Sequence, residues 1–316
     1  MTFQTAGESQ GRMLAALCVL WLLALFAGLA VRLNAQPPPA FSGQRAFDDL
    51  RHLVSFGPRP PGSPALAAAR AWMIRQLRED GCAVTEDAFT APTPIGSLKM
   101  ENLIVKIPGE SRSVVMLAGH YDTKRFTKFR FVGANDGGSS AAFLMEMGRV
   151  LCGRKDKYTV WLTFFDGEEA IGQEMSPTDG TYGSRHLEQE LASEGELSRI
   201  QSMILVDMIA DKDLDIRRDS NSTGWLNDLL FRTADRLGYS RYFLGNETLP
   251  VGDDHTPFIE AGVAAVDIID FDYGPNDSYW HSPEDTVARC SAASLGIVGR
   301  VVENMLRALD NSPRVH

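Results

Sequence analysis

Cysteine is scarce in this chain of 316 residues, which contains only four. Cys18 lies in an apolar run near the amino terminus, and the other three cannot all pair with one another. No CxxC pair is present. The sequence therefore excludes a disulfide scaffold and argues against a structural zinc site built from thiolates.

Blocks of lysine and arginine are also missing, and 31 basic side chains stand against 41 acidic ones, a formal net charge of −10. Nucleic-acid-binding surfaces need clustered basic residues, so we expect no nucleic-acid partner. An overall acidic charge mainly keeps a protein soluble. Acidic side chains that gather inside a site attract a metal ion or an amine instead.

The uncharged run at residues 13–31 departs from an ordinary globular composition. As a helix it would span about 28 Å, close to the roughly 30 Å hydrocarbon core of a bilayer. Two interpretations are open: an uncleaved membrane anchor, or a signal peptide removed near Ala35. The run is long for a signal peptide and Leu33-Asn34-Ala35 is a poor cleavage site, which favours the anchor. Both interpretations predict an extracytoplasmic protein, with the membrane as a partner if the helix is uncleaved.

Three parts follow from this pattern. Residues 1–35 are assigned to the anchor or signal segment, and residues 36–43, which contain Pro37-Pro38-Pro39, to a stiff linker. Residues 44–312 have the length of one large domain.

Helical and strand patterns alternate along this domain. Strands are expected at 83–89, 101–107, 113–118, 158–165, 201–208 and 263–269, and helices at 46–56, 63–80, 139–153, 183–194, 224–237 and 290–310. The alternation predicts an α/β fold: a single domain with a central mixed, largely parallel sheet that is flanked by helices and preceded by one N-terminal hydrophobic helix.

Acidic and histidine side chains follow most of the expected strands, at the edge of the sheet where α/β proteins bind ligands. They occur in His120-Tyr121-Asp122, Asn135-Asp136, Glu168-Glu169, Asp207, Asp253-Asp254-His255 and Trp280-His281, which hold three of the six histidines. Each alone has an ordinary explanation, such as a helix cap at Asp136. Carboxylates with imidazole and without thiolate are the ligands of a catalytic zinc site, so their joint occurrence predicts one. His52 and His186 lie outside these stretches and are predicted to be structural.

This ordered set resembles the zinc-dependent exopeptidases typified by the leucyl aminopeptidase of vibrios. Within that superfamily the chain looks most like the animal-type glutaminyl-peptide cyclotransferases. The resemblance covers residues 44–310 and is carried by three stretches, at residues 164–170, 176–187 and 253–258.

The resemblance implies one zinc ion (Zn2+) per chain, with Asp136, Glu169 and His281 as its ligands. It implies that Glu168 is the general acid and base. The remaining family positions imply a hydrogen-bonded acidic pair at Asp207 and Asp253 and an aromatic wall beside the substrate at Trp280.

The implied activity is that of an acyltransferase that converts the N-terminal glutamine of peptides or proteins to pyroglutamate and releases ammonia. Zinc would polarise the γ-carbonyl, and Glu168 would carry a proton from the α-amine to the departing ammonia. Asp253 would hydrogen-bond the leaving nitrogen. Because consecutive side chains of an extended chain point in opposite directions, Glu169 can face the metal while Glu168 faces the substrate.

Two other functions remain open. His120 and Asp207 match the second metal site of the two-zinc aminopeptidases, which hydrolyse N-terminal residues. A non-catalytic anchored interaction domain is the third interpretation, although the presence of all the metal ligands argues against it. The chain also departs from the cyclotransferase pattern at three positions: Gly119 replaces a cysteine, Asp267 a histidine and Met175 a tryptophan.

Overall fold

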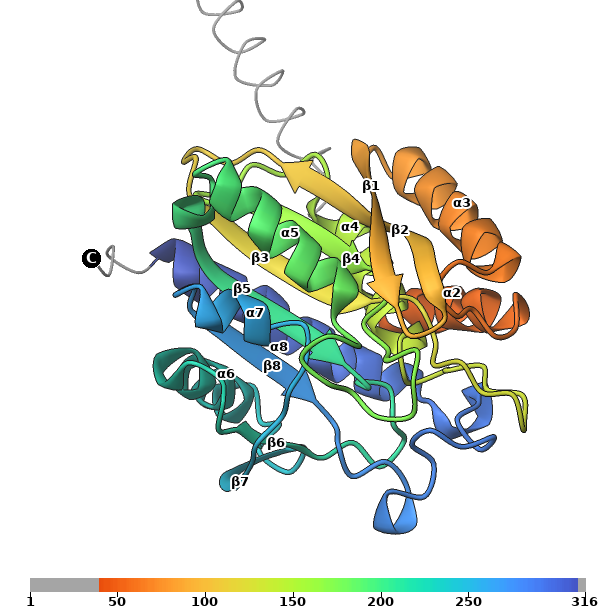
Figure 1. Cartoon of the computed structure of the whole chain (residues 1–316). Coiled ribbons are helices and arrows are strands. Elements are labelled where there is room, and N and C mark those ends of the chain that lie inside the picture. Colours follow the sequence, from red (N-terminus) through yellow and green to blue (C-terminus); the bar gives the residue numbers. More distant parts are fainter. Residues whose placement is uncertain (1–39, 312–316) are drawn as a thin grey trace, which may run out of the picture. The chain divides into compact units, whose positions relative to one another are not determined.

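Six strands form the central sheet, in the spatial order β1-β2-β4-β3-β5-β8 (Figure 1). Their bounds are β1 Val84–Thr93, β2 Gly96–Ile107, β3 Val114–His120, β4 Thr159–Phe165, β5 Ile200–Asp207 and β8 Ala265–Ile269. The four neighbours β4, β3, β5 and β8 are parallel, whereas β2 pairs antiparallel with both β1 and β4. The predicted mixed, largely parallel sheet is confirmed.

The computed structural model describes residues 40–311. The predicted anchor or signal segment, its hydrophobic helix and the first half of the predicted linker, residues 36–39, lie outside the described residues. None of the helices within residues 40–311 has the length and apolar composition needed to cross a membrane.

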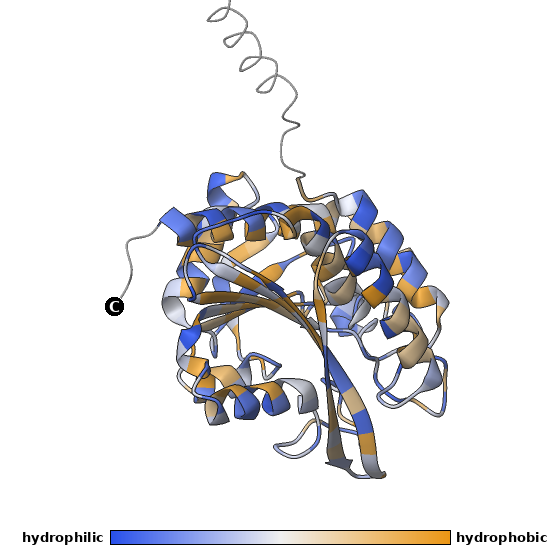
Figure 2. Ribbon diagram, turned by 90° about the horizontal axis from the view of Figure 1, so that it is seen from above, coloured by the Kyte–Doolittle hydropathy of each residue, from blue (hydrophilic) through white to orange (hydrophobic). Residues whose placement is uncertain are grey.

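Helices cover both faces of the sheet (Figure 2). The side chains of strand β3 show why both faces need cover. Val115 and Leu117 pack into the larger core, while Val114, Met116 and Ala118 pack into a second core on the opposite face. The larger core contains α2 Gly43–Ser55, α3 Pro64–Glu79, α4 Gly138–Leu151, α6 Gly224–Arg236 and α8 Ala292–Asn311; the second contains α5 Tyr182–Ser193 and α7 Thr256–Glu260. A strand that is buried on both faces has a continuous apolar sequence, and such an apolar run is what predicted β3.

The long helices begin and end close to the expected residues because their caps are visible in the sequence. Ser42 and Ser63 precede α2 and α3, and their hydroxyl oxygens accept hydrogen bonds from the backbone N–H groups of Arg45 and Leu66. Pro64 occupies the first turn of α3, where a missing N–H costs nothing.

The structure differs from the expected elements in two places. Strands β1 and β2 extend to a two-residue turn at Pro94-Ile95. Taken one by one, the residues next to this turn look typical of a loop, but they pair with each other along the hairpin. Pro92 is tolerated there because β1 is an edge strand. The sequence pattern also missed several short elements: β6 Ile216–Asp219, β7 Phe243–Leu249, helix α7 and 3-10 turns at Leu197–Arg199, Pro275–Asp277 and Val287–Arg289.

A disulfide joins Cys82, which follows α3, to Cys152, which follows α4. Cys290 is buried and free. The bond links residues 70 positions apart and so restricts the unfolded chain. In the chain-entropy description, closing a loop of this length stabilises the folded state by about 4 kcal/mol, and the measured stabilisation is often smaller.

We therefore predict that breaking this bond lowers the free energy of unfolding by roughly 2–4 kcal/mol. The measurement is urea unfolding of the wild type with and without a reductant, beside the Cys82→Ala/Cys152→Ala variant. The variant should be as unstable as the reduced wild type and indifferent to the reductant. Equal stability of the oxidised and reduced wild type would contradict the prediction.

Candidate active site

The carboxyl ends of the parallel strands bring the predicted residues together at one edge of the sheet. β3 ends at His120, β4 leads into Glu168 and Glu169, and β5 ends at Asp207. These side chains, or their close neighbours, surround a cavity of about 440 Å³. Its walls contain all the predicted site residues except His120, which is buried beneath it: Asp136, Glu168, Glu169, Asp207, Asp253, Trp280 and His281.

Asp136, Glu169 and His281 form the first group of metal-binding side chains. His281 Nε2 lies 3.4 Å from Asp136 Oδ2 and 3.3 Å from Glu169 Oε1. One ligand atom from each residue falls within 4.8 Å of the other two. Asp136 Oδ2 is buried without a hydrogen-bond partner, as expected of an oxygen that serves a cation. The residues present therefore fit a zinc ion.

His120, Asp136 and Asp207 form a second group with similar dimensions. His120 Nε2 lies 3.3 Å from Asp136 Oδ1 and 3.2 Å from Asp207 Oδ1, and its Nδ1 lies 3.4 Å from Asp122 Oδ1. The two oxygens of Asp136 thus face the two groups, one each. The ligand atoms of this second group are therefore also close enough together to hold an ion.

The turn that follows β4 separates the directions of Glu168 and Glu169. Gly167 has φ +73°, a left-handed conformation that a side chain would strain, and Met100 Sδ fills the space beside it. Both glutamates donate their backbone N–H groups to the carboxylate of Asp122. The Glu169 carboxylate accepts a hydrogen bond from the backbone N–H of Lys124 and lies 3.5 Å from Lys124 Nζ. Among residues 40–311 no such partner contacts the Glu168 carboxylate, and Glu168 lines the cavity.

The electrostatics of the first metal group favour positive charge. Burial acts to lower the pKa of His281, but Asp136 and Glu169 outweigh it and raise that pKa to about 10. Burial acts in the opposite sense on Asp136, whose pKa His120 and His281 hold well below its ordinary value. The raised pKa of His281 shows that the carboxylates stabilise positive charge at this position, and the lowered pKa of Asp136 shows that this acid stays ionised beside it.

The substrate side of the cavity is strongly acidic. Burial, followed by the charge of Asp253, raises the pKa of Glu168 well above its ordinary value. Burial, followed by the charge of Asp207, raises the pKa of Asp253 to about 7. Asp207 and Asp253 are therefore close neighbours, although no hydrogen bond joins these two described residues. Asp207 instead accepts hydrogen bonds from Ser140 and from the backbone of Met208.

Asp267, where the resemblance implies a histidine, is fully buried beside this acidic pair. Neither of its carboxylate oxygens has a hydrogen-bond partner. Burial, followed by the charge of Asp253, raises its pKa well above the ordinary value. Burial and the neighbouring carboxylates thus favour the neutral form of Asp267, whereas a histidine would bring a ring that can carry positive charge.

Aromatic side chains close one side of the cavity. Trp280 stacks on the metal-group residue His281, with ring centroids 4.1 Å apart, and packs against Phe271 at 5.1 Å. Phe126 contacts the edge of His281 from another side. Met175, where the resemblance implies a tryptophan, lies on the rim and is 42% exposed.

Two supporting acids escaped prediction as site residues. Asp122 holds the backbone of both glutamates, as described above. Asp285 accepts hydrogen bonds from the backbone N–H groups of Asn135 and Asp136 and from the hydroxyl of Tyr273. Asp122 belongs to the His120-Tyr121-Asp122 stretch that follows a strand, and Asp285 lies four residues after His281, but only their contacts reveal that they position the loops rather than the reacting atoms.

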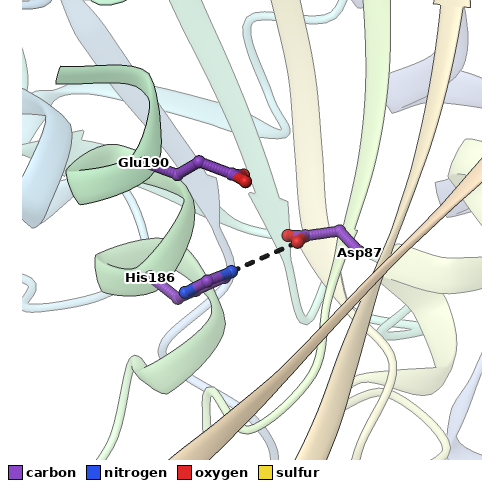
Figure 3. A group of neighbouring side chains, drawn as sticks. All are labelled: Asp87, His186 and Glu190. Carbon is purple, nitrogen blue, oxygen red and sulfur yellow. Dashed lines mark hydrogen bonds and ion pairs between the residues drawn. The ribbon is translucent and has the colours of Figure 1, made fainter. Parts of the chain in front are cut away.

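Away from this edge, Asp87, His186 and Glu190 also lie close enough together to hold an ion (Figure 3). His186 Nε2 lies 3.1 Å from Asp87 Oδ1, and its ring stacks on Phe89 at 4.3 Å. These contacts join α5 to β1, which agrees with the structural role predicted for His186.

Comparison with known proteins places this site in a known family. The sequence model described as Peptidase family M28 matches residues 102–306. A glutaminyl-peptide cyclotransferase-like protein of Mus musculus is 31% identical over 273 residues, which cover 77% of this chain and 70% of that protein.

Solved structures agree. The glutaminyl cyclase of an Acidobacteriales bacterium is 43% identical and superposes with a TM-score of 0.82, covering 87% of this chain and 97% of the other. The glutaminyl cyclase of Porphyromonas gingivalis is 29% identical with a TM-score of 0.78, covering 85% and 99%.

We predict that zinc stabilises this protein through the first metal group. At a free concentration one hundred times Kd, a ligand adds about 2.7 kcal/mol to the free energy of unfolding, which raises Tm by roughly 5–10 °C for a domain of this size. The His281→Ala variant should lose most of this shift, and the matched His52→Ala variant, altered on α2, should keep it. Thermal unfolding with a chelator and with added zinc makes the measurement. A wild-type Tm that does not change when zinc is added, or a Tm shift in His281→Ala as large as that of the wild type, would refute the assignment.

Proposed function

The chain belongs to peptidase family M28 and, within it, to the glutaminyl-peptide cyclotransferases, and from this premise we propose how its site performs their reaction. It is an enzyme that converts the N-terminal glutamine of a peptide to pyroglutamate and releases ammonia. Asp136, Glu169 and His281 hold one zinc ion, and Glu168 is the general acid and base.

The observation that supports this division of labour is the different surroundings of two adjacent glutamates. Glu169 faces Lys124 and His281. Glu168 faces the cavity, where its nearest charged neighbours include Asp253. A site that needs one carboxylate for a cation and another for protons requires this separation.

When bound, a zinc ion supplies Lewis-acid polarisation of the substrate's γ-carbonyl oxygen. The first group is the better candidate for its ligands because its three side chains border the cavity that substrate must enter. His120 of the second group is buried and already bonded to Asp122 and Asp207.

Within the cavity, Glu168 accepts a proton from the substrate's α-amine as that nitrogen attacks the γ-carbonyl carbon. The new C–N bond closes the ring, the bond to the amide nitrogen breaks, and Glu168 returns the proton to the departing ammonia. Both reacting groups belong to one residue, so little translational freedom remains to be lost. Asp253 hydrogen-bonds the leaving nitrogen, Asp207 supports Asp253, and Trp280 walls the glutamine side chain.

The acidic character of the cavity suits a cationic N-terminus. An amine drawn into the cavity reduces the repulsion among Glu168, Asp207 and Asp253, which lie there together. The same negative charges that repel one another in the free protein therefore contribute to substrate binding.

The second metal group favours a second candidate, a two-zinc aminopeptidase, because its ligand atoms are already within reach of one another. That enzyme would hydrolyse the bond after the first residue instead of closing a ring. The two activities give different products from the same peptide.

We further propose that the enzyme acts outside the cytoplasm, anchored through residues 13–31. The uncharged run supports the anchor. The bond between Cys82 and Cys152 supports an oxidising compartment, where disulfides persist.

The Glu168→Gln variant tests the proposed role of this residue. We expect it to retain zinc, because Glu168 is no ligand, and to lose about 10²- to 10⁴-fold in kcat for release of ammonia from a peptide that begins with glutamine. Elemental analysis reports the zinc and a coupled ammonia assay the rate.

The control is Glu169→Gln, which should lose zinc affinity and activity together. Normal cyclisation by Glu168→Gln would show that another group moves the proton. Release of a free N-terminal residue by the wild type, without ammonia, would favour the aminopeptidase.

A further inference from the structure

The segment that follows β3 is the most basic stretch of an acidic chain. Residues 124–131 alternate cations with aromatic rings, in the order Lys124-Arg125-Phe126-Thr127-Lys128-Phe129-Arg130-Phe131. The stretch begins two residues after Asp122, so the fold places it at the same sheet edge as the metal groups.

The cations of this segment differ in what they contact. Lys124 is buried, donates to the carbonyl of Ala170 and lies beside Glu169. Arg125 and Lys128 are exposed, and neither has an acidic partner among residues 40–311. Because Arg125 and Lys128 line the same cavity, their unpaired charges together produce a local positive field there for a ligand.

These two cations line a second cavity, of about 670 Å³, which adjoins the site cavity. Lys124, Phe126 and Gln173 belong to the walls of both. The remaining walls of the second cavity contain no carboxylate: Ile95, Arg125, Thr127, Lys128, Phe129, Ile171 and Gly172.

Phe126 forms the partition between the two cavities. Its ring stacks on Phe129 at 4.5 Å, and it contacts the edges of Phe131 at 5.3 Å and His281 at 5.7 Å. The Phe126 ring therefore packs against a metal-group residue on one side and against the basic segment on the other. A chain that leaves the site cavity past Phe126 enters an apolar and basic surface.

We infer that the second cavity binds the residues that follow the N-terminal glutamine and selects peptides with a carboxylate there; this rests on the proposed function. An extended peptide advances about 3.3 Å per residue, so its next few residues leave the site cavity. The two cavities then have opposite charge preferences. The acidic one takes the amine, and the basic one takes the acidic side chains downstream, which orients the substrate.

Three amidated peptides test this inference, because they differ only in downstream charge: Gln-Ala-Glu-Glu-amide, Gln-Ala-Gln-Gln-amide and Gln-Ala-Lys-Lys-amide. Their affinities are measured on the Glu168→Gln protein, whose slow turnover leaves time to measure binding, and their kcat/KM values on the wild type. We expect the Glu peptide to bind about fivefold more tightly than the Gln peptide, which is the scale of exposed ion pairs, and the Lys peptide to bind most weakly. The preference should shrink at about 1 M salt, where charges are screened within about 3 Å.

The Arg125→Glu/Lys128→Glu variant should abolish or reverse this order while leaving the turnover of glutamine amide unchanged. The matched control is Arg112→Glu/Lys155→Glu, which makes the same change in net charge. Arg112 precedes β3 and Lys155 precedes β4, so both lie at the opposite edge of the sheet. The control should keep the wild-type order.

Equal affinity for the three peptides would overturn the inference, as would a control variant that loses the preference to the same extent. Binding of anionic vesicles through Arg125 and Lys128, without any preference among the peptides, would assign the segment to a membrane surface and would also overturn it. If the protein binds the peptides charge-selectively but never cyclises them, this inference is supported and the proposed function is refuted. The inference and the proposed function can therefore fail separately.

Discussion

Mutual repulsion among carboxylates is the constraint around which this site is built. Parallel strands place their carboxyl ends at one edge, and here that edge collects Asp136, Glu168, Glu169, Asp207 and Asp253. Buried acids that are so close together keep their charge only beside cations. Histidines at two sides of Asp136 and the ammonium group of Lys124 each relieve part of this repulsion, and a divalent metal bound there would relieve more of it.

Other acids at the same edge are used to hold the loops. Asp122 receives the backbone N–H groups of both glutamates, and Asp285 receives those of Asn135 and Asp136. Because these bonds orient the backbone, the side chains of Asp136 and Glu169 point at one another instead of apart. In the proposed mechanism, one of the two glutamates after the buried strand is a metal ligand and the other carries the proton, and the basic segment after β3 adds a region of opposite charge next to them.

Much of this arrangement could be predicted from the sequence, because its causes are local. The apolar run that became β3 and the Ser63-Pro64 cap of α3 depend on neighbouring residues only, and the order of acids and histidines marked the site. The roles of Asp122 and Asp285 could not be predicted, since they depend on backbone groups up to 150 residues away. The bond between Cys82 and Cys152 and the cavity beside Phe126 likewise arise from segments that meet only in the folded chain.

Anomalous diffraction at the zinc absorption edge, from crystals of the zinc-loaded protein, tests the central claim most directly. One full-occupancy peak bounded by Asp136, Glu169 and His281, with Glu168 outside its coordination sphere, is the predicted result. A second peak of equal height between His120 and Asp207, or a peak that Glu168 coordinates, would contradict the single-zinc site and the separate roles of the two glutamates.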